Sequence, residues 1–158
     1  MRTIMKTLFA ICSIALALGL SPVRAHGDDP QAGHDDTFGK PGDPAKVSRT
    51  IEVDMTDAMR FTPTKISVRK GETVRFAVTN SGRLKHEMVL GTARELRAHA
   101  ELMKKFPEME HEDPNQLSLE GGRKGELIWQ FTKSGTFDFA CLQPGHFEAG
   151  MRGRIAVK

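Results

Sequence analysis

Residues 137–151 read FDFACLQPGHFEAGM and join the end of a predicted strand to a short loop. Phe137 and Phe139 are separated by one polar residue, which is the period of a strand with one buried face. Three side chains that bind soft metals follow at offsets of zero, five and ten: Cys141, His146 and Met151. Thiolate, imidazole and thioether ligands suit copper in both oxidation states, whereas Mg²⁺ and Ca²⁺ prefer oxygen. The stretch therefore predicts a copper site at the end of a strand.

A centre of this kind needs a second histidine from elsewhere in the chain. His86 is suited to this role because it opens the apolar run HEMVL, residues 86–90, which predicts a short strand. The alternative interpretation of His86 is a strand-edge histidine that binds no metal. The alternative for Met151 is a packing residue, with a backbone carbonyl or no ligand in the axial position.

The N-terminus has the pattern of an export signal. Arg2 and Lys6 precede an apolar stretch over 8–20, and a small-residue cleavage site ends at Ala25. The apolar stretch is too short to predict a membrane-spanning helix. We therefore expect residues 1–25 to be a cleaved signal peptide, the mature protein to lie in the periplasm, and no membrane anchor to remain.

Loss of residues 1–25 changes both the charge and the thiol count. The segment holds three basic residues and no acidic one, so Lys+Arg falls from 23 to 20 against 20 Asp+Glu. A formally neutral chain lacks the positive field that nucleic-acid binding needs, so we expect no nucleic-acid partner. Cys12 is also lost, which leaves Cys141 without a partner for an internal disulfide. Metal binding explains a lone thiol in an oxidising compartment.

The remaining chain divides into a tail and one domain. Residues 26–48 are rich in Asp, Gly and Pro, and we expect a flexible tail because they cannot bury enough apolar surface to order themselves. Seven short alternating runs follow, at 51–55, 66–68, 74–78, 86–90, 127–131, 137–141 and 155–157. They predict an all-β fold over 49–158, a two-sheet antiparallel sandwich. Residues 93–106 have helical spacing, and residues 108–125 are expected to form a loop.

Several segments resemble those of the cupredoxin family. The resemblance covers roughly residues 49–158 and is carried by RFTP at 60–63, VRKGETVRF at 68–76, NSG at 80–82, HE at 86–87 and the loop from Cys141 to Met151. Within the family, the chain is most similar to the periplasmic copper-tolerance cupredoxins of the CopI type, which add histidines and methionines to this domain. The resemblance implies a Greek-key β-sandwich.

The resemblance also implies roles for the four ligands. His86, Cys141 and His146 would form the trigonal plane of one type 1 copper ion, with Met151 as the weak axial ligand. The spacing from Cys141 to His146 is nearer to azurin-like than to plastocyanin-like members, and Met151 lies one residue further on than in azurin. Whether the site is blue or green stays open. We expect further hydrogen bonds to orient both imidazoles, although the sequence does not identify their acceptors.

Other histidines and methionines leave a second copper site open. His99 and Met103 lie four residues apart on the predicted helix and project to the same face, and Met109 and His111 follow closely. These four side chains would suit Cu(I). The alternative, which we favour, is that His99 and Met103 cover the sandwich while Met109 and His111 are solvated.

The predicted tail contains two further candidate ligands, His26 and His34. Cleavage after residue 25 would make His26 the first residue, and its α-amine and imidazole would together chelate Cu(II). The alternative is an acidic tail in which both histidines are incidental.

Two functions use the same predicted centre. The first is periplasmic copper handling in support of copper tolerance, with a copper-trafficking protein as partner, and the spare histidines and methionines favour it. The second is a soluble one-electron carrier with a partner such as a cytochrome, and the apolar residues around His146 favour it. We expect a non-enzyme, because six histidines in a chain of this length leave no room for a trinuclear copper cluster.

Overall fold

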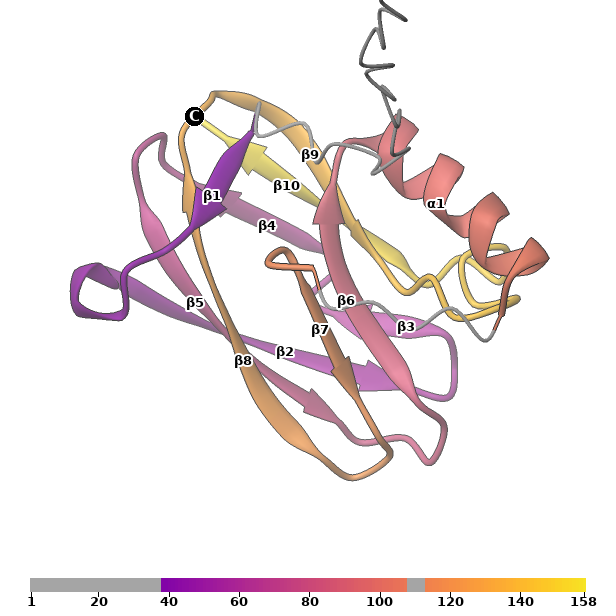
Figure 1. The fold of residues 1–158 in the computed structure, drawn as a ribbon. Coiled ribbons are helices and arrows are strands. Elements are labelled where there is room, and N and C mark those ends of the chain that lie inside the picture. The colour runs from indigo at the N-terminus through magenta and orange to yellow at the C-terminus, as the bar shows by residue number, and fades with distance from the viewer. Residues whose placement is uncertain (1–37, 108–112) are drawn as a thin grey trace, which may run out of the picture. The chain divides into compact units, whose positions relative to one another are not determined.

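A computed structural model describes residues 38–107 and 113–158, which form two β-sheets and one helix (Figure 1). The first sheet contains, in spatial order, β1 (Gly39–Pro41), β8 (Lys124–Phe131), β5 (Thr73–Asn80), β2 (Arg49–Thr56) and β3 (Arg60–Thr62). The second contains β4 (Lys65–Val68), β10 (Arg152–Val157), β9 (Gly135–Ala140), β6 (His86–Gly91) and β7 (Gln116–Leu119). A short 3-10 helix spans Pro44–Lys46, and α1 spans Ala93–Lys105. The predicted sandwich with one helical insertion is confirmed.

The main core lies between the two sheets. From Val74 onward, β5 alternates buried and half-buried residues, because successive side chains of a strand point to opposite faces. On β9, Phe137 and Phe139 are both buried, and the Phe139 ring meets the Phe61 ring edge-on at 4.9 Å between centroids. Cys141 belongs to the same buried cluster. The strand that delivers the thiol is therefore anchored in the core.

Strand direction differs from the prediction in two places. β2 pairs with β5 in parallel, with Ile51 opposite Phe76, and β10 pairs with β4 in parallel, with Ile155 opposite Ile66. The prediction of a wholly antiparallel sandwich is therefore wrong. Apolar alternation indicates that a segment is a strand but carries no information on the direction of its neighbour. The chain crosses to the second sheet in β4 and returns to the first in β5, and this crossing brings parallel strands together.

The domain starts earlier than the predicted boundary at residue 49. Phe38 is buried, and its ring stacks on Trp129 and contacts Phe137, with 5.2 Å between centroids in both pairs. β1 then pairs with β8, with Gly39 opposite Phe131. Composition hid this strand because β1 consists of Gly39, Lys40 and Pro41, and the one large apolar side chain beside it, Phe38, comes just before it. The predicted signal peptide and the predicted tail up to residue 37 lie outside the described residues.

The predicted loop over 108–125 also contains regular structure. β7 occupies 116–119 and pairs antiparallel with β6, which places Leu119 opposite His86. β8 begins at Lys124, before the end of the predicted loop. The QLSL sequence of β7 is too short to show a strand period, so its pairing with β6 decides its conformation. Residues 108–112 lie outside the described part of the chain.

Helix α1 covers one side of the second sheet, beside the loop that follows β9 (Figure 1). A capping box starts it: Thr92 accepts the N–H of Glu95, and the Glu95 carboxylate accepts the N–H of Thr92. Its buried face packs with strand and loop residues in a second apolar cluster of Val89, Leu96, Ala100, Met103, Ala140 and Leu142. Phe106, the last residue of the predicted helix, is exposed because α1 ends at residue 105. No helix in the described ranges is long and apolar enough to cross a membrane.

Candidate metal centre

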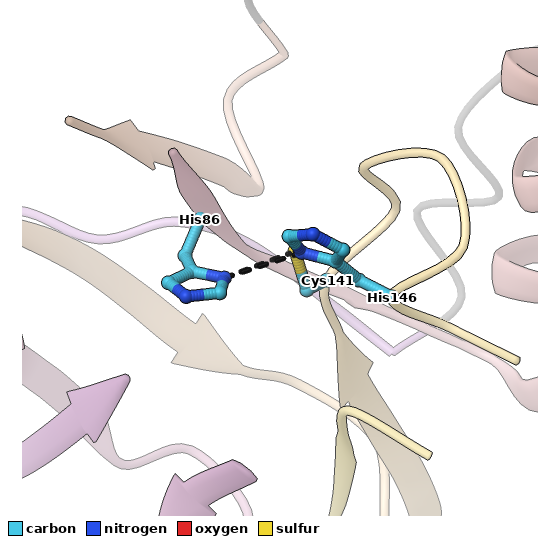
Figure 2. A group of neighbouring side chains, drawn as sticks. All are labelled: His86, Cys141 and His146. Carbon is cyan, nitrogen blue, oxygen red and sulfur yellow. Dashed lines mark hydrogen bonds between the residues drawn. The ribbon is translucent and has the colours of Figure 1, made fainter. Parts of the chain in front are cut away.

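Three predicted ligands converge at one end of the second sheet (Figure 2). His86 is the first residue of β6, Cys141 directly follows β9, and His146 lies in the loop between β9 and β10. Nδ1 of His146 lies 3.2 Å from the Cys141 Sγ and 3.2 Å from the His86 Nδ1. The Cys141 Sγ lies 4.0 Å from the His86 Nδ1. Among the His, Cys, Asp and Glu side chains of the described residues, this is the one group of three or more gathered at metal-binding range.

Backbone hydrogen bonds join the two ends of the ligand loop, residues 141–151. The Cys141 N–H donates to the Met151 carbonyl at 3.0 Å, and the Met151 N–H donates to the His146 carbonyl, also at 3.0 Å. Two tight bends make this path possible at Gly145 and Gly150, whose φ angles of 85° and 91° favour glycine. The Met151 side chain is fully buried. Met151 is thus fixed through its backbone to two of the three clustered residues.

Burial sets the protonation of the thiol. Cys141 is fully buried, and loss of hydration raises its pKa to about 12. The N–H of Glu87 donates to the Cys141 Sγ at 3.4 Å and acts in the opposite direction, but it does not outweigh burial. The metal-free chain therefore carries a neutral thiol at pH 7. A metal ion that binds the sulfur must displace this proton.

The second imidazole is also kept neutral. Burial lowers the pKa of His146, and the neighbouring His86 lowers it further. A neutral imidazole is the form that binds a metal ion. Two imidazole nitrogens and one sulfur form a soft donor set, which fits copper and fits Mg²⁺ or Ca²⁺ poorly.

Comparison with known proteins agrees with this donor set. Residues 47–158 match the profile of the copper-binding proteins of the plastocyanin/azurin family. The chain is a cupredoxin of this family. The match covers both sheets apart from β1, and it includes every predicted ligand of the main centre.

Relatives of this cupredoxin include three proteins described as copper-resistant cuproprotein CopI. The one from Rubrivivax gelatinosus is 51% identical over 140 residues, which cover 89% of this chain and 82% of the relative. The one from Pseudomonas aeruginosa is 38% identical and covers 79% of this chain and 84% of the relative. The one from Vibrio cholerae is 34% identical, with 72% and 68% covered.

Solved structures share the fold of the cupredoxin at low sequence identity. Auracyanin B superimposes with a TM-score of 0.62 at 22% identity, over 77% of this chain and 99% of its own. An azurin from Methylomonas sp. strain J gives a TM-score of 0.54 at 21% identity, over 71% and 99%. At these identities the likeness establishes the fold alone.

Of the auxiliary candidates for a second copper site of the cupredoxin, the structure describes Met103 and His99. Met103 is buried in the second apolar cluster, where its neighbours on α1 are Leu96 and Ala100, so it packs as the favoured interpretation predicted. His99 is half-buried on the same helix. The other four lie outside the described residues: His26, His34, Met109 and His111. A second copper site stays a prediction.

Sequence reasoning missed the side chains that hold the ligand loop of the cupredoxin. Glu87 is buried on β6, and its carboxylate accepts a hydrogen bond from the Gln143 side chain in the loop. From β3, the Arg60 guanidinium donates to the Ala149 carbonyl at 3.2 Å. Glu87 directly follows a predicted ligand in the sequence, which is the one local signal that it lies near the centre. Nothing local links Arg60 to the loop.

A carboxylate outside the cluster contacts the first histidine of the cupredoxin. Asp57, in the turn between β2 and β3, places its Oδ1 3.1 Å from the His86 Nε2. Hydrogen bonds from the backbone N–H groups of Arg83 and Leu84 lower the pKa of Asp57, and the contact with His86 lowers it further. Asp57 is therefore ionised at pH 7.

Proposed function

We propose that this cupredoxin binds one redox-active copper ion and handles it in support of copper resistance. The ligands would be His86, Cys141, His146 and Met151. The observation that carries the proposal is the convergence of one sulfur and two imidazole nitrogens within 4.8 Å of one another. The relatives described as copper-resistant cuproproteins support the physiological role.

The chain would supply the ligands in a nearly fixed arrangement. A bound copper ion would supply one-electron chemistry by cycling between Cu(I) and Cu(II). Cys141 is buried and tied by its backbone to Met151, and His86 sits at the start of a strand that is hydrogen-bonded on both sides. Ligands held by strands move little when the charge of the ion changes. Both oxidation states would then be bound with little rearrangement of the protein.

A soluble electron carrier is the second candidate function. His86 is fully buried, but His146 is only half-buried, so its imidazole lies near the surface. An imidazole that bridges a buried metal and the surface suits transfer of electrons to a transient partner. We propose a binding protein rather than an enzyme, placed in the periplasm by residues 1–25.

Copper titration of the chain without residues 1–25 tests the metal centre. We expect one equivalent of Cu(II) to give an intense thiolate-to-copper absorption band, and Cys141→Ser to abolish it. Met103→Leu is a matched control, because Met103 is a buried sulfur residue outside the centre. A Cys141→Ser chain that keeps the band and its tight copper uptake would refute the proposal.

Growth of a deletion strain separates the two functions. Copper resistance restored by the wild-type chain but not by Cys141→Ser would support copper handling. An unaltered copper tolerance in the deletion strain, together with fast electron exchange between the purified protein and a cytochrome, would support the carrier instead.

A further inference from the structure

The two ring nitrogens of His86 face different surroundings. Nδ1 points into the cluster, 3.2 Å from the His146 Nδ1 and 4.0 Å from the Cys141 Sγ. Nε2 points away from the cluster and lies 3.1 Å from the Asp57 Oδ1. We propose that Asp57 is a positioning residue that holds the His86 proton on Nε2, so that Nδ1 is presented to copper. This inference rests on the copper site proposed above.

A neutral imidazole carries one donor nitrogen and one acceptor nitrogen. A carboxylate only accepts, so the nitrogen facing Asp57 must carry the proton. The opposite tautomer of His86 would set a lone pair against the carboxylate and leave Nδ1 protonated. Asp57 therefore selects the tautomer whose Nδ1 has a free lone pair.

The loop over 80–84 holds Asp57 in place. The Arg83 N–H donates to both carboxylate oxygens, at 3.0 and 2.9 Å, and the Leu84 N–H donates to Oδ1 at 3.2 Å. Asn80 is fully buried and braces this loop, since its side chain donates to the Leu84 carbonyl at 2.8 Å and accepts the Gly82 N–H at 3.0 Å. The position of the Asp57 carboxylate is therefore fixed by hydrogen bonds from a braced loop.

A glycine leaves the space that Asp57 occupies. A Cβ at Gly82 would lie 2.1 Å from the Asp57 Oδ1 and 2.8 Å from its Cγ. These distances are far below van der Waals contact, so alanine at this position would push the carboxylate away. Gly82→Ala therefore displaces Asp57 from His86 without changing any charge.

The charge of Asp57 favours the more positive copper ion. A carboxylate that accepts the outer proton of a ligating histidine makes the inner nitrogen a stronger ligand, and loss of such a partner weakens metal binding about 10–100-fold. The effect is larger for Cu(II) than for Cu(I), because Cu(II) carries the greater charge. Asp57 therefore lowers the reduction potential of the centre.

Three variants of the chain without residues 1–25 test this role. Asp57→Asn removes the charge, and Gly82→Ala displaces it. Asp54→Asn is the matched control. Asp54 lies on β2, just before the turn that holds Asp57, and its carboxylate oxygens accept the Ser81 hydroxyl at 2.7 and 2.8 Å rather than contacting His86. For each variant, Cu(I) and Cu(II) affinities are measured by competition with chelators, and the reduction potential is measured separately.

We expect Asp57→Asn and Gly82→Ala to weaken Cu(II) binding about tenfold more than Cu(I) binding. A tenfold change in the ratio of the two affinities corresponds to a rise of about 59 mV in reduction potential. Asp54→Asn is expected to leave both affinities and the potential unchanged. Equal potentials for Asp57→Asn and Asp54→Asn would overturn the inference, even if Asp57→Asn unfolds at a lower temperature.

Nitrogen NMR of the Cu(I)-loaded wild-type chain gives a readout that does not depend on how the variants fold. We expect the His86 Nε2 to carry a slowly exchanging proton, while Nδ1 is bound to the metal. An unprotonated Nε2 would overturn the inference. Failure of the wild-type chain to show copper bound through Cys141 would instead overturn the proposed function, so the two failures are distinguishable.

Discussion

The buried thiol predicts a pH-dependent loss of stability in the metal-free protein. Burial raises the pKa of Cys141 from an ordinary value of 9.0 to about 12. In the unfolded chain the thiol is solvated and ionises near pH 9, whereas in the folded chain it keeps its proton up to about pH 12. Between these values the folded state binds more protons, so the free energy of unfolding falls as pH rises.

The magnitude follows from the two pKa values. At 1.36 kcal/mol per pH unit, the thiol contributes a loss of about 1.4 kcal/mol by pH 10 and about 4 kcal/mol by pH 12. Below pH 8 it contributes almost nothing, because both states are protonated. A serine at this position does not ionise in this range. Cys141→Ser should therefore lose about 1.4 kcal/mol less stability than the wild-type chain between pH 8 and pH 10.

Denaturant unfolding at pH 8 and pH 10 gives the free energy of unfolding of both metal-free chains. The change in this free energy between the two pH values is then compared, which cancels any constant cost of the substitution. Direct titration of the thiol is also practical, because the chain contains no tyrosine whose ionisation would mask the thiolate absorbance. The same pH dependence in wild type and Cys141→Ser, or a thiolate signal that rises fully by pH 9.5, would show that folding does not raise the pKa of Cys141.

Three other substitutions test parts of the fold around the centre. Phe38→Ala should destabilise the domain by about 3 kcal/mol because its ring is buried in the core, whereas Phe106→Ala at an exposed site should change little; equal melting temperatures would contradict the assignment of β1 to the domain. Gly153→Ala places a Cβ 2.1 Å from the Phe139 ring and should lower the free energy of unfolding by about 1–3 kcal/mol in denaturant titration, so an unchanged free energy of unfolding would count against this packing. Lys104→Met removes an exposed ion pair at 2.6 Å between α1 and the ligand loop, and the copper absorption band should stay unchanged, which visible spectroscopy can check.

The main centre was accessible from the sequence because its signals are local. Cys141, His146 and Met151 fall within one loop, and the softness of their side chains identifies the class of metal without any knowledge of the fold. The strand period before Cys141 placed the thiol at the end of a buried strand, which β9 confirms. His86 was identified by its position at the start of an apolar run, and the structure brings it to the same cluster.

The donor set, the all-β fold class and the helical insertion follow from the order of the amino acids, since residue chemistry and the spacing of apolar residues act over short stretches of chain. Long-range packing set the parallel strand pairs, the place of Phe38 in the core and the burial of Met103. It also decided which carboxylates reach the centre: Asp57 lies 29 residues from His86, and Glu87 meets Gln143 across 56. Contacts of this kind depend on how separate strands and loops come together in space, and no local pattern records that.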